Sequence, residues 1–226
     1  MNYKLVFDLG YYDGRSTLNF LESGFKVIGV ECNPNMLNRC QILYKQYIDE
    51  ERLILIDKAI SNVDDSTIPF YINNVNKEWS SCLKKIPTRI NDDDVEKILV
   101  KTITLKSMIK KYGCPYFCKI DIEGYDIIAL KSLIGEKELP KYIQAESECI
   151  GDEDPDKIDF LEILNTLRDL GYTKFAFERG SNTANFQPEG LRYQNYDSIK
   201  ELIIHTRYNF NFLQPWFFWF DIIATY

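Results

Sequence analysis

The stretch that decides the fold is KLVFDLGYYDGRST, residues 4–17. It opens with a short apolar run, Lys4–Leu9, that is typical of a buried strand, and it leads into a helical pattern over Arg15–Glu22. Gly10 and Gly14 lie in the turn between them, where a residue without a Cβ lets the backbone bend tightly and approach a ligand. A strand, a glycine turn and a helix in this order predict the first unit of an α/β fold.

The same alternation of apolar runs and helical patterns continues from residue 3 to about residue 179. It indicates a mostly parallel sheet with helices on both faces. A chain of 226 residues can bury one such core, so we predict a single domain over residues 1–226. The seven strands are expected at Lys4–Leu9, Lys26–Glu31, Leu53–Asp57, Phe117–Asp121, Tyr142–Glu146, Thr173–Phe177 and Phe218–Ala224.

Helix signals lie between these strands. Asn33 can cap a helix that has Pro34 in its first turn, and Gly171 is a usual stop signal. Further helices are expected at Arg15–Glu22, Thr104–Tyr112, Glu123–Leu133 and along the face formed by Phe160, Leu164 and Leu167. Two polar and aromatic stretches, Asn73–Asp94 and Gly180 to about Gln214, fit no element and are predicted to be lids over a site.

Composition argues against several classes of function. The net charge of −7 disfavours general binding to nucleic acid. No secretory signal precedes the first strand, and the most apolar stretch, Pro215–Ala224, is too short for a membrane helix and contains Asp221. The six cysteines are scattered and His205 is the only histidine, so a zinc site is not expected. We therefore expect a cytoplasmic protein with no membrane or nucleic-acid partner.

Acidic residues stand at the ends of successive predicted strands. In an open parallel sheet, ligands bind outside the carboxyl ends of the strands, at the point where the strand order reverses. One such acid would be an ordinary capping or turn residue. Five acids at equivalent positions, each at the end of a strand, predict a site along one edge of the sheet. These residues are Asp8, Glu31, Asp57, Asp121 and Glu146.

The type of ligand follows from two of these positions. An acid at the tip of the second strand, Glu31, can accept hydrogen bonds from both hydroxyls of a ribose, and Asp57-Lys58-Ala59 lies where an adenine edge would fall. The turn lacks the G-x-G-x-x-G pattern that cradles a pyrophosphate. The sequence therefore predicts a nucleoside site that requires no phosphate, and a nicotinamide-dependent oxidoreductase becomes the less favoured alternative.

Five blocks together resemble the FkbM family of methyltransferases, in family order and over roughly residues 3–148. The most specific is Lys119-Ile120-Asp121-Ile122-Glu123-Gly124. The others are Val6-Phe7-Asp8-Leu9-Gly10 with Gly14 and Thr17, Val30-Glu31-Cys32-Asn33-Pro34, Ala59-Ile60-Ser61 with Phe70-Tyr71, and Thr104-Leu105-Lys106-Ser107. The resemblance implies a Rossmann-like class I methyltransferase fold, with a cofactor-binding half (1–148) and an acceptor-side half (149–226).

The resemblance also implies S-adenosyl-L-methionine as the cofactor. The residues expected to hold it are Asp8, Gly10, Tyr12, Asp13, Gly14, Thr17, Glu31, Asn33, Asp57, Lys58, Ala59 and Asp121. Family members usually carry Ala-Asn where this chain has Tyr11-Tyr12, so Tyr12 either supplies a hydroxyl in place of the amide or packs. This departure supports a further alternative, a domain that keeps the cofactor fold without catalysis.

For the base that takes the acceptor's proton, Asp121 is the first candidate, followed by Glu123, Glu146 and His205. Glu123 could instead compensate charge at a helix N-terminus, and the lone His205 could be structural. Asp121 and Glu146 could also hold a divalent cation, but no third ligand is evident and no metal is expected.

By resemblance, the acceptor is expected to be a hydroxyl of a sugar or glycan, with a polyketide-like small molecule as the second choice. Aromatic faces beside polar groups suit such acceptors, although core packing explains the same residues equally well. The aromatic residues in question are Tyr193, Tyr196, Tyr208, Phe210, Phe212, Trp216 and Trp219.

Overall fold

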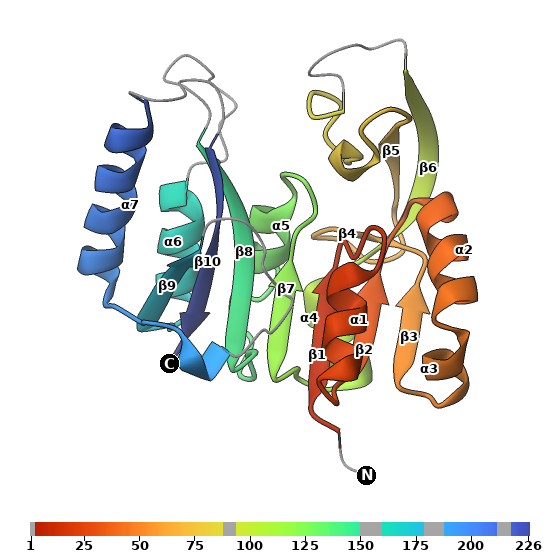
Figure 1. Cartoon of the computed structure of the whole chain (residues 1–226), viewed down its shortest axis with the longest axis horizontal. Coiled ribbons are helices and arrows are strands. Elements are labelled where there is room, and N and C mark those ends of the chain that lie inside the picture. Colours follow the sequence, from red (N-terminus) through yellow and green to blue (C-terminus); the bar gives the residue numbers. More distant parts are fainter. Residues whose placement is uncertain (1–2, 88–93, 150–159, 179–187, 212–217) are drawn as a thin grey trace.

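The computed structural model describes residues 3–87, 94–149, 160–178, 188–211 and 218–226. Its main sheet has seven strands in the order β3-β2-β1-β7-β8-β10-β9, and β10 alone runs antiparallel to its neighbours (Figure 1). All seven predicted strands are present, with ends that differ slightly from the predicted ones. Their bounds are β1 Leu5–Leu9, β2 Lys26–Val30, β3 Leu53–Ile56, β7 Phe117–Ile120, β8 Tyr142–Cys149, β9 Lys174–Glu178 and β10 Phe218–Thr225.

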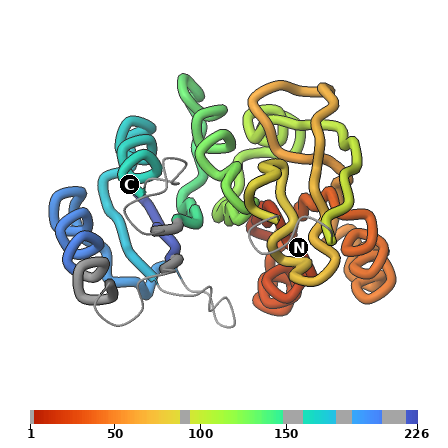
Figure 2. Tube along the Cα trace, turned by 90° about the horizontal axis from the view of Figure 1, so that it is seen from above, coloured from red at the N-terminus to blue at the C-terminus, as the bar shows by residue number. Residues whose placement is uncertain are grey.

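Helices cover both faces of this sheet (Figure 2). Alternate residues of β1 enter different cores: Val6 packs with α1 (Arg15–Glu22), α2 (Pro34–Leu43) and α3 (Lys45–Asp49). Phe7 belongs to the core on the opposite face. The helices that cover this second core are α4 (Leu105–Tyr112), α5 (Asp126–Lys131), α6 (Phe160–Asp169) and α7 (Tyr196–Asn211). Both faces of the central strands are therefore apolar, as expected for a parallel sheet between two helical layers.

A second, three-stranded sheet stands beyond the carboxyl ends of β1–β3 (Figure 1). Its order is β4-β6-β5, with β4 at Ala59–Ile60, β5 at Thr67–Asn73 and β6 at Val95–Ile103. A short 3₁₀ helix, η1 (Lys77–Trp79), follows β5. The sequence analysis missed this sheet, partly because Pro69 argues against a strand interior; β5 is an edge strand, where proline is tolerated.

Two predictions about helices were wrong. The stretch from Gly180 to Gln214, predicted to form no element, contains α7, whose Ile199 and Ile203 are fully buried in the core. The helix predicted to begin at Glu123 begins at Asp126, because Glu123 and Gly124 have positive φ angles of 51° and 89° that a right-handed helix does not allow. Over the described part of the chain, none of the helices combines the length and apolar character needed to cross a bilayer.

Candidate functional site

A cavity of about 500 Å³ opens at the carboxyl ends of the strands. It lies at the switch point between β1 and β7, since the chain runs outward from β1 through β2 to β3 on one side and from β7 to β8 on the other. Its walls come from the β1–α1 turn, the tips of β2 and β7, strand β8, strand β4 and the η1 region. Glu31 and Asp121 both line it, so the carboxylates predicted for the cofactor and for the acceptor share one space.

The glycine turn is wedged between two strand tips. Gly10 donates its N–H to the Val30 carbonyl at 2.9 Å and has a φ of 81°. A Cβ at this position would stand 1.8 Å from the backbone oxygen of Asp121, so no side chain fits there. Gly14, with a φ of 82°, is similarly closed in by Tyr44. These two glycines let the turn pass close to the residue after β7 on one side and to α2 on the other.

Asp8 lies beneath the turn and does not line the cavity, contrary to prediction. Its side chain is fully buried, and one carboxylate oxygen accepts hydrogen bonds from Ser16 at 2.9 Å and Thr17 at 2.6 Å. Burial raises the pKa of this carboxyl group, and Lys119 opposes that rise. Thr17 is buried with it. Both residues therefore fasten α1 to β1 and hold the turn from below.

Glu31 is buried at the tip of β2 with its carboxylate facing the cavity. One oxygen accepts the backbone N–H of Asn33 at 2.7 Å, and the other accepts that of Tyr12 at 3.1 Å. Burial raises the pKa of this carboxyl group to about 7, against the effect of these two bonds. Asn33 also caps α2 as predicted, because its side-chain oxygen accepts the Asn35 N–H.

The tyrosine pair has two different environments. Tyr11 is buried in the core on the α1 face and packs so tightly against Gly29 that a Cβ there would lie 2.8 Å from its ring. Tyr12 lines the cavity in a left-handed conformation, with a φ of 47°, that directs its N–H to Glu31. Asp13 also lines the cavity and forms an ion pair with Arg15 at 2.8 Å.

On the β3 side, the structure separates the three residues predicted to meet adenine. Asp57 is exposed and does not line the cavity, because β3 ends at Ile56 and the chain turns there into β4. Lys58 and Ala59 do line it. Of the five acids predicted to converge, Glu31, Asp121 and Glu146 therefore line the cavity, whereas Asp8 and Asp57 do not.

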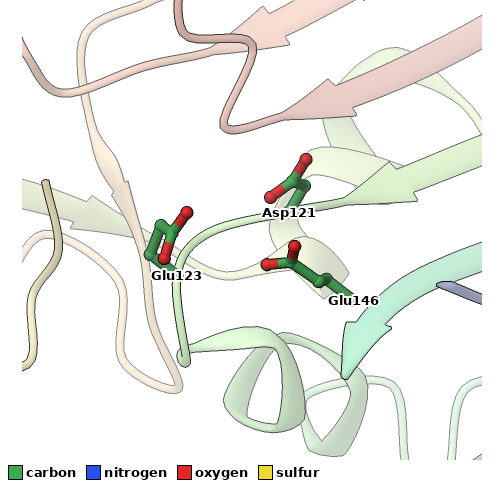
Figure 3. Close-up of side chains that lie close together, drawn as sticks. All are labelled: Asp121, Glu123 and Glu146. Atoms are coloured by element: carbon green, nitrogen blue, oxygen red, sulfur yellow. The ribbon is translucent and has the colours of Figure 1, made fainter. Parts of the chain in front are cut away.

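Three carboxylates converge at the β7–β8 side of the cavity: Asp121, Glu123 and Glu146 (Figure 3). One oxygen from each lies within 4.8 Å of the others. Burial, and then the nearby charges of Asp121 and Glu123, raise the pKa of Glu146 well above its ordinary range. Three such oxygens could ligate a hard divalent cation, and Glu123 is the third ligand that the sequence analysis did not find. The same oxygens can accept a proton, and we assign no ion to them.

Lys119 is the main site residue whose role the sequence analysis missed. It is buried in β7, lines the cavity and donates to one oxygen of Asp121 at 2.6 Å. The charges of Asp121 and Asp8 raise its pKa despite burial, so it carries a positive charge. The sequence signal for this contact is a lysine inside an apolar strand, two residues before an aspartate. Residues two apart in a strand point to the same face, so the two side chains can meet.

The segment after β5 forms the roof of the cavity. Lys77, Glu78 and Trp79 of η1 line it, together with Ser80 and Cys82. Part of the stretch Asn73–Asp94, predicted to be a lid, therefore borders the cavity, and its role as a lid stays a prediction. Residues 88–93 lie outside the described part of the chain.

The second predicted lid does not contribute the residues expected of it. His205 is exposed on α7, which packs against α6 and β9, and it does not line the cavity. Tyr193 donates to the Pro188 carbonyl, and Tyr196 donates to Asn165 at 2.5 Å, so both serve packing within this region. Of the other aromatic residues proposed to meet the acceptor, Tyr208 and Phe210 belong to α7 and Trp219 belongs to β10, but the structure does not describe their side chains. Phe212 and Trp216 lie outside the described residues.

Comparisons with known proteins agree with this geometry. The family profile described as methyltransferase FkbM domain matches residues 8–174. The solved structure of StiE O-MT, residues 961–1257, superposes with a TM-score of 0.51 at 8% identity, over 98% of this chain and 67% of that one. At such low identity the similarity shows the fold alone, which is that of class I methyltransferases.

Two further solved structures are similar. A precorrin-6y C5,15-methyltransferase from Geobacter metallireducens has a TM-score of 0.43 at 10% identity, over 98% of this chain and 78% of that one. A SAM-dependent methyltransferase from Geobacter sulfurreducens, in complex with S-adenosyl-L-homocysteine, has a TM-score of 0.49 at 10% identity, over 99% and 84%. No curated protein sequence matches the chain significantly.

Proposed function

Because the chain belongs to the FkbM family of S-adenosylmethionine-dependent methyltransferases, we propose that it methylates a hydroxyl oxygen of a sugar or glycan. One observation carries the proposal: a single cavity is lined by Glu31, suited to a ribose, and by a cluster of carboxylates, suited to an alcohol that must lose its proton. The O-methyl specificity and the sugar acceptor are our inference from this chemistry and the family resemblance.

The cofactor would lie along the β1–α1 turn. Glu31 keeps lone pairs toward the cavity after accepting two backbone N–H groups, and a carboxylate in this position can accept both ribose hydroxyls. We place the remaining contacts at the predicted residues that line the cavity, namely Gly10, Tyr12, Asp13, Asn33, Lys58, Ala59 and Asp121. Asp8, Gly14 and Thr17 would act by shaping the turn.

S-adenosylmethionine, when bound, would supply a methyl group on a positively charged sulfur, for transfer to an oxygen lone pair with the sulfur as the leaving group. The chain's contribution is alignment, which is worth up to about 7–11 kcal/mol of the barrier. A carboxylate that accepts the hydroxyl proton adds roughly 10²–10⁴-fold.

Asp121 is our first candidate for this proton acceptor. Lys119 occupies one of its oxygens, which fixes the side chain and leaves the second oxygen available to a substrate hydroxyl. Glu123 and Glu146 lie close enough to share the proton afterwards. Burial and the nearby charges raise the pKa of Glu146, so this carboxylate can readily hold that proton.

Two substitutions separate cofactor binding from catalysis. Glu31→Ala should abolish binding of S-adenosylhomocysteine in isothermal titration, because it removes the ribose acceptor. Asp121→Asn keeps the size of the side chain and should leave that affinity within about two-fold, while turnover falls by at least about 100-fold. Unchanged turnover in Asp121→Asn would remove this residue from the role of base.

The acceptor is identified by screening methyl transfer to sugars, glycan extracts and polyketide-like alcohols, read by mass shift. Transfer to a sugar hydroxyl is the expected result. Transfer only to the other alcohols would refute the sugar assignment and keep the methyltransferase. Failure to bind S-adenosylhomocysteine would instead favour a domain that keeps the fold without catalysis.

A further inference from the structure

A buried serine ties the roof of the cavity to the carboxylate cluster. We define the cap segment as residues 74–87, which follow β5 and line part of the cavity. Ser81, in its middle, is 1% exposed, and its hydroxyl donates to the backbone carbonyl of Glu123 at 2.7 Å. The two residues are 42 positions apart in the sequence, so this bond joins separate parts of the fold.

Ser81 is itself held firmly. Its N–H donates to the Tyr71 carbonyl at 3.0 Å, and its carbonyl accepts the Tyr71 N–H at 2.8 Å, which extends the second sheet by one bridge. Its hydroxyl oxygen also accepts the Leu83 N–H at 2.9 Å. The hydroxyl hydrogen is thereby directed at the backbone carbonyl of Glu123.

The other end of this bond is a strained residue. Glu123 has a φ of 51°, a left-handed conformation that side chains other than glycine adopt only when the surroundings impose it. This conformation turns the chain sharply after β7 and leaves the Glu123 carboxylate beside Asp121 and Glu146 (Figure 3). A right-handed conformation at residue 123 would continue toward α5 and direct the side chain elsewhere.

From this arrangement we propose that Ser81 is a positioning residue: its hydroxyl holds Glu123 in the conformation that brings the third carboxylate into the acceptor site. The inference rests on the proposed function, because it takes the cluster to face the acceptor. It assigns a role in the acceptor site to a residue of the cap segment. The second sheet would then act in catalysis by holding Ser81 in place.

The structural test needs no acceptor. In a crystal structure of Ser81→Ala, the Glu123 carboxylate should leave the cluster, while the Gly10 turn and Glu31 stay in place and S-adenosylhomocysteine binds within about two-fold of the wild-type affinity. If Glu123 keeps its φ and its place beside Asp121, the proposal is wrong. This outcome is readable even if the acceptor screen fails, so the two failures are distinguishable.

With an acceptor in hand, kinetics decide whether Ser81 acts through Glu123. Ser81→Ala should lower kcat by at least about ten-fold, because small displacements of reacting groups are costly. Glu123→Gln should lower it as well, and adding Ser81→Ala to that variant should cause no further loss. If kcat of the double variant instead falls by the product of the two single-variant losses, the two residues act independently and the proposal is overturned.

Three further variants test whether the effect comes from the loss of the Ser81 hydroxyl. Ser132 donates a hydrogen bond of the same length, 2.7 Å, to the Ala129 carbonyl at the end of α5, so Ser132→Ala is the matched control and should leave kcat unchanged. Ser81→Thr keeps the hydroxyl and should retain most of the activity. If Ser81→Ala does not fold, Ser81→Cys replaces it, since a thiol of similar size is a weaker donor and should lower kcat in the same way.

Discussion

Glu31 occupies an environment that links its charge to cofactor binding. Burial raises the pKa of its carboxyl group to about 7, so below that pH the free protein holds a proton there. Two ribose hydroxyls donate better to the ionised carboxylate than to the protonated form. Binding at low pH must therefore release the proton, and the cost of this release appears as weaker affinity.

We accordingly expect the affinity for S-adenosylhomocysteine to rise with pH between 6 and 8, by up to about ten-fold, and to level off above pH 8. Isothermal titration in buffers of different ionisation enthalpy measures both the affinity and the proton release. Glu31→Gln is the control: it should bind more weakly and lose this part of the pH dependence, whereas other buried acids such as Asp221 still titrate. A wild-type affinity that is flat from pH 6 to 8 would place the ribose elsewhere.

Single residues also show where sequence reasoning reaches its limit. The positions of Glu31, Asp121 and Glu146 followed from strand ends, because the carboxyl ends of parallel strands must meet. The same rule could not tell that Asp8 turns inward to Ser16 and Thr17. That choice depends on which hydroxyl groups reach the side chain once α1 has packed. His205 was chosen by residue type alone, and the packing of α7 places it away from the cavity.

At the scale of elements, the turn between β1 and α1 depends on a close approach to β7. A Cβ added at Gly10 would lie 1.8 Å from the backbone oxygen of Asp121. Because this oxygen belongs to the main chain, it cannot move without disturbing β7. The positive φ of 81° adds a second penalty for any other residue. The turn and the backbone of Asp121 are therefore coupled through this close contact.

Gly10→Ala should destabilise the protein by clearly more than the roughly 1–2 kcal/mol that a left-handed alanine costs, and it should abolish S-adenosylhomocysteine binding. Gly24→Ala is a matched control, because Gly24 has a similar φ of 84° and nothing within 4 Å of the added Cβ. Urea unfolding of both variants measures the difference between strain alone and strain with a clash. If both variants lose the same free energy of unfolding, β7 must shift to make room for the added Cβ at residue 10.

A helix or strand can be predicted from the sequence when its pattern of apolar residues is regular and strong. The strands of the main sheet are buried on both faces and read as continuous apolar runs, which makes them visible. β5 and β6 are half exposed and include Pro69, so their pattern is weak. In α7, the buried Ile199 and Ile203 lie among many polar residues, and the helical period was overlooked.

For the molecule as a whole, one core joins the two halves distinguished in the sequence. The larger apolar cluster contains Phe7 of β1 as well as Phe220 of β10. Strand β8 ends at Cys149 and pairs along its length with β10, so a boundary at residue 148 would cut the sheet through its best-paired strands. We therefore propose a single domain over residues 1–226 rather than two units that fold separately.

This proposal predicts one cooperative unfolding transition for the whole chain, with coincident curves by far-UV circular dichroism and tryptophan fluorescence. A chain ending at residue 148 loses β9, β10, α6 and α7, which exposes the buried faces of β8 and α5 to water. It should show no cooperative transition and no binding of S-adenosylhomocysteine, although every proposed cofactor contact is still present in its sequence. A shortened chain that folds and binds would instead establish residues 1–148 as an autonomous unit, with the later elements added to it for acceptor recognition.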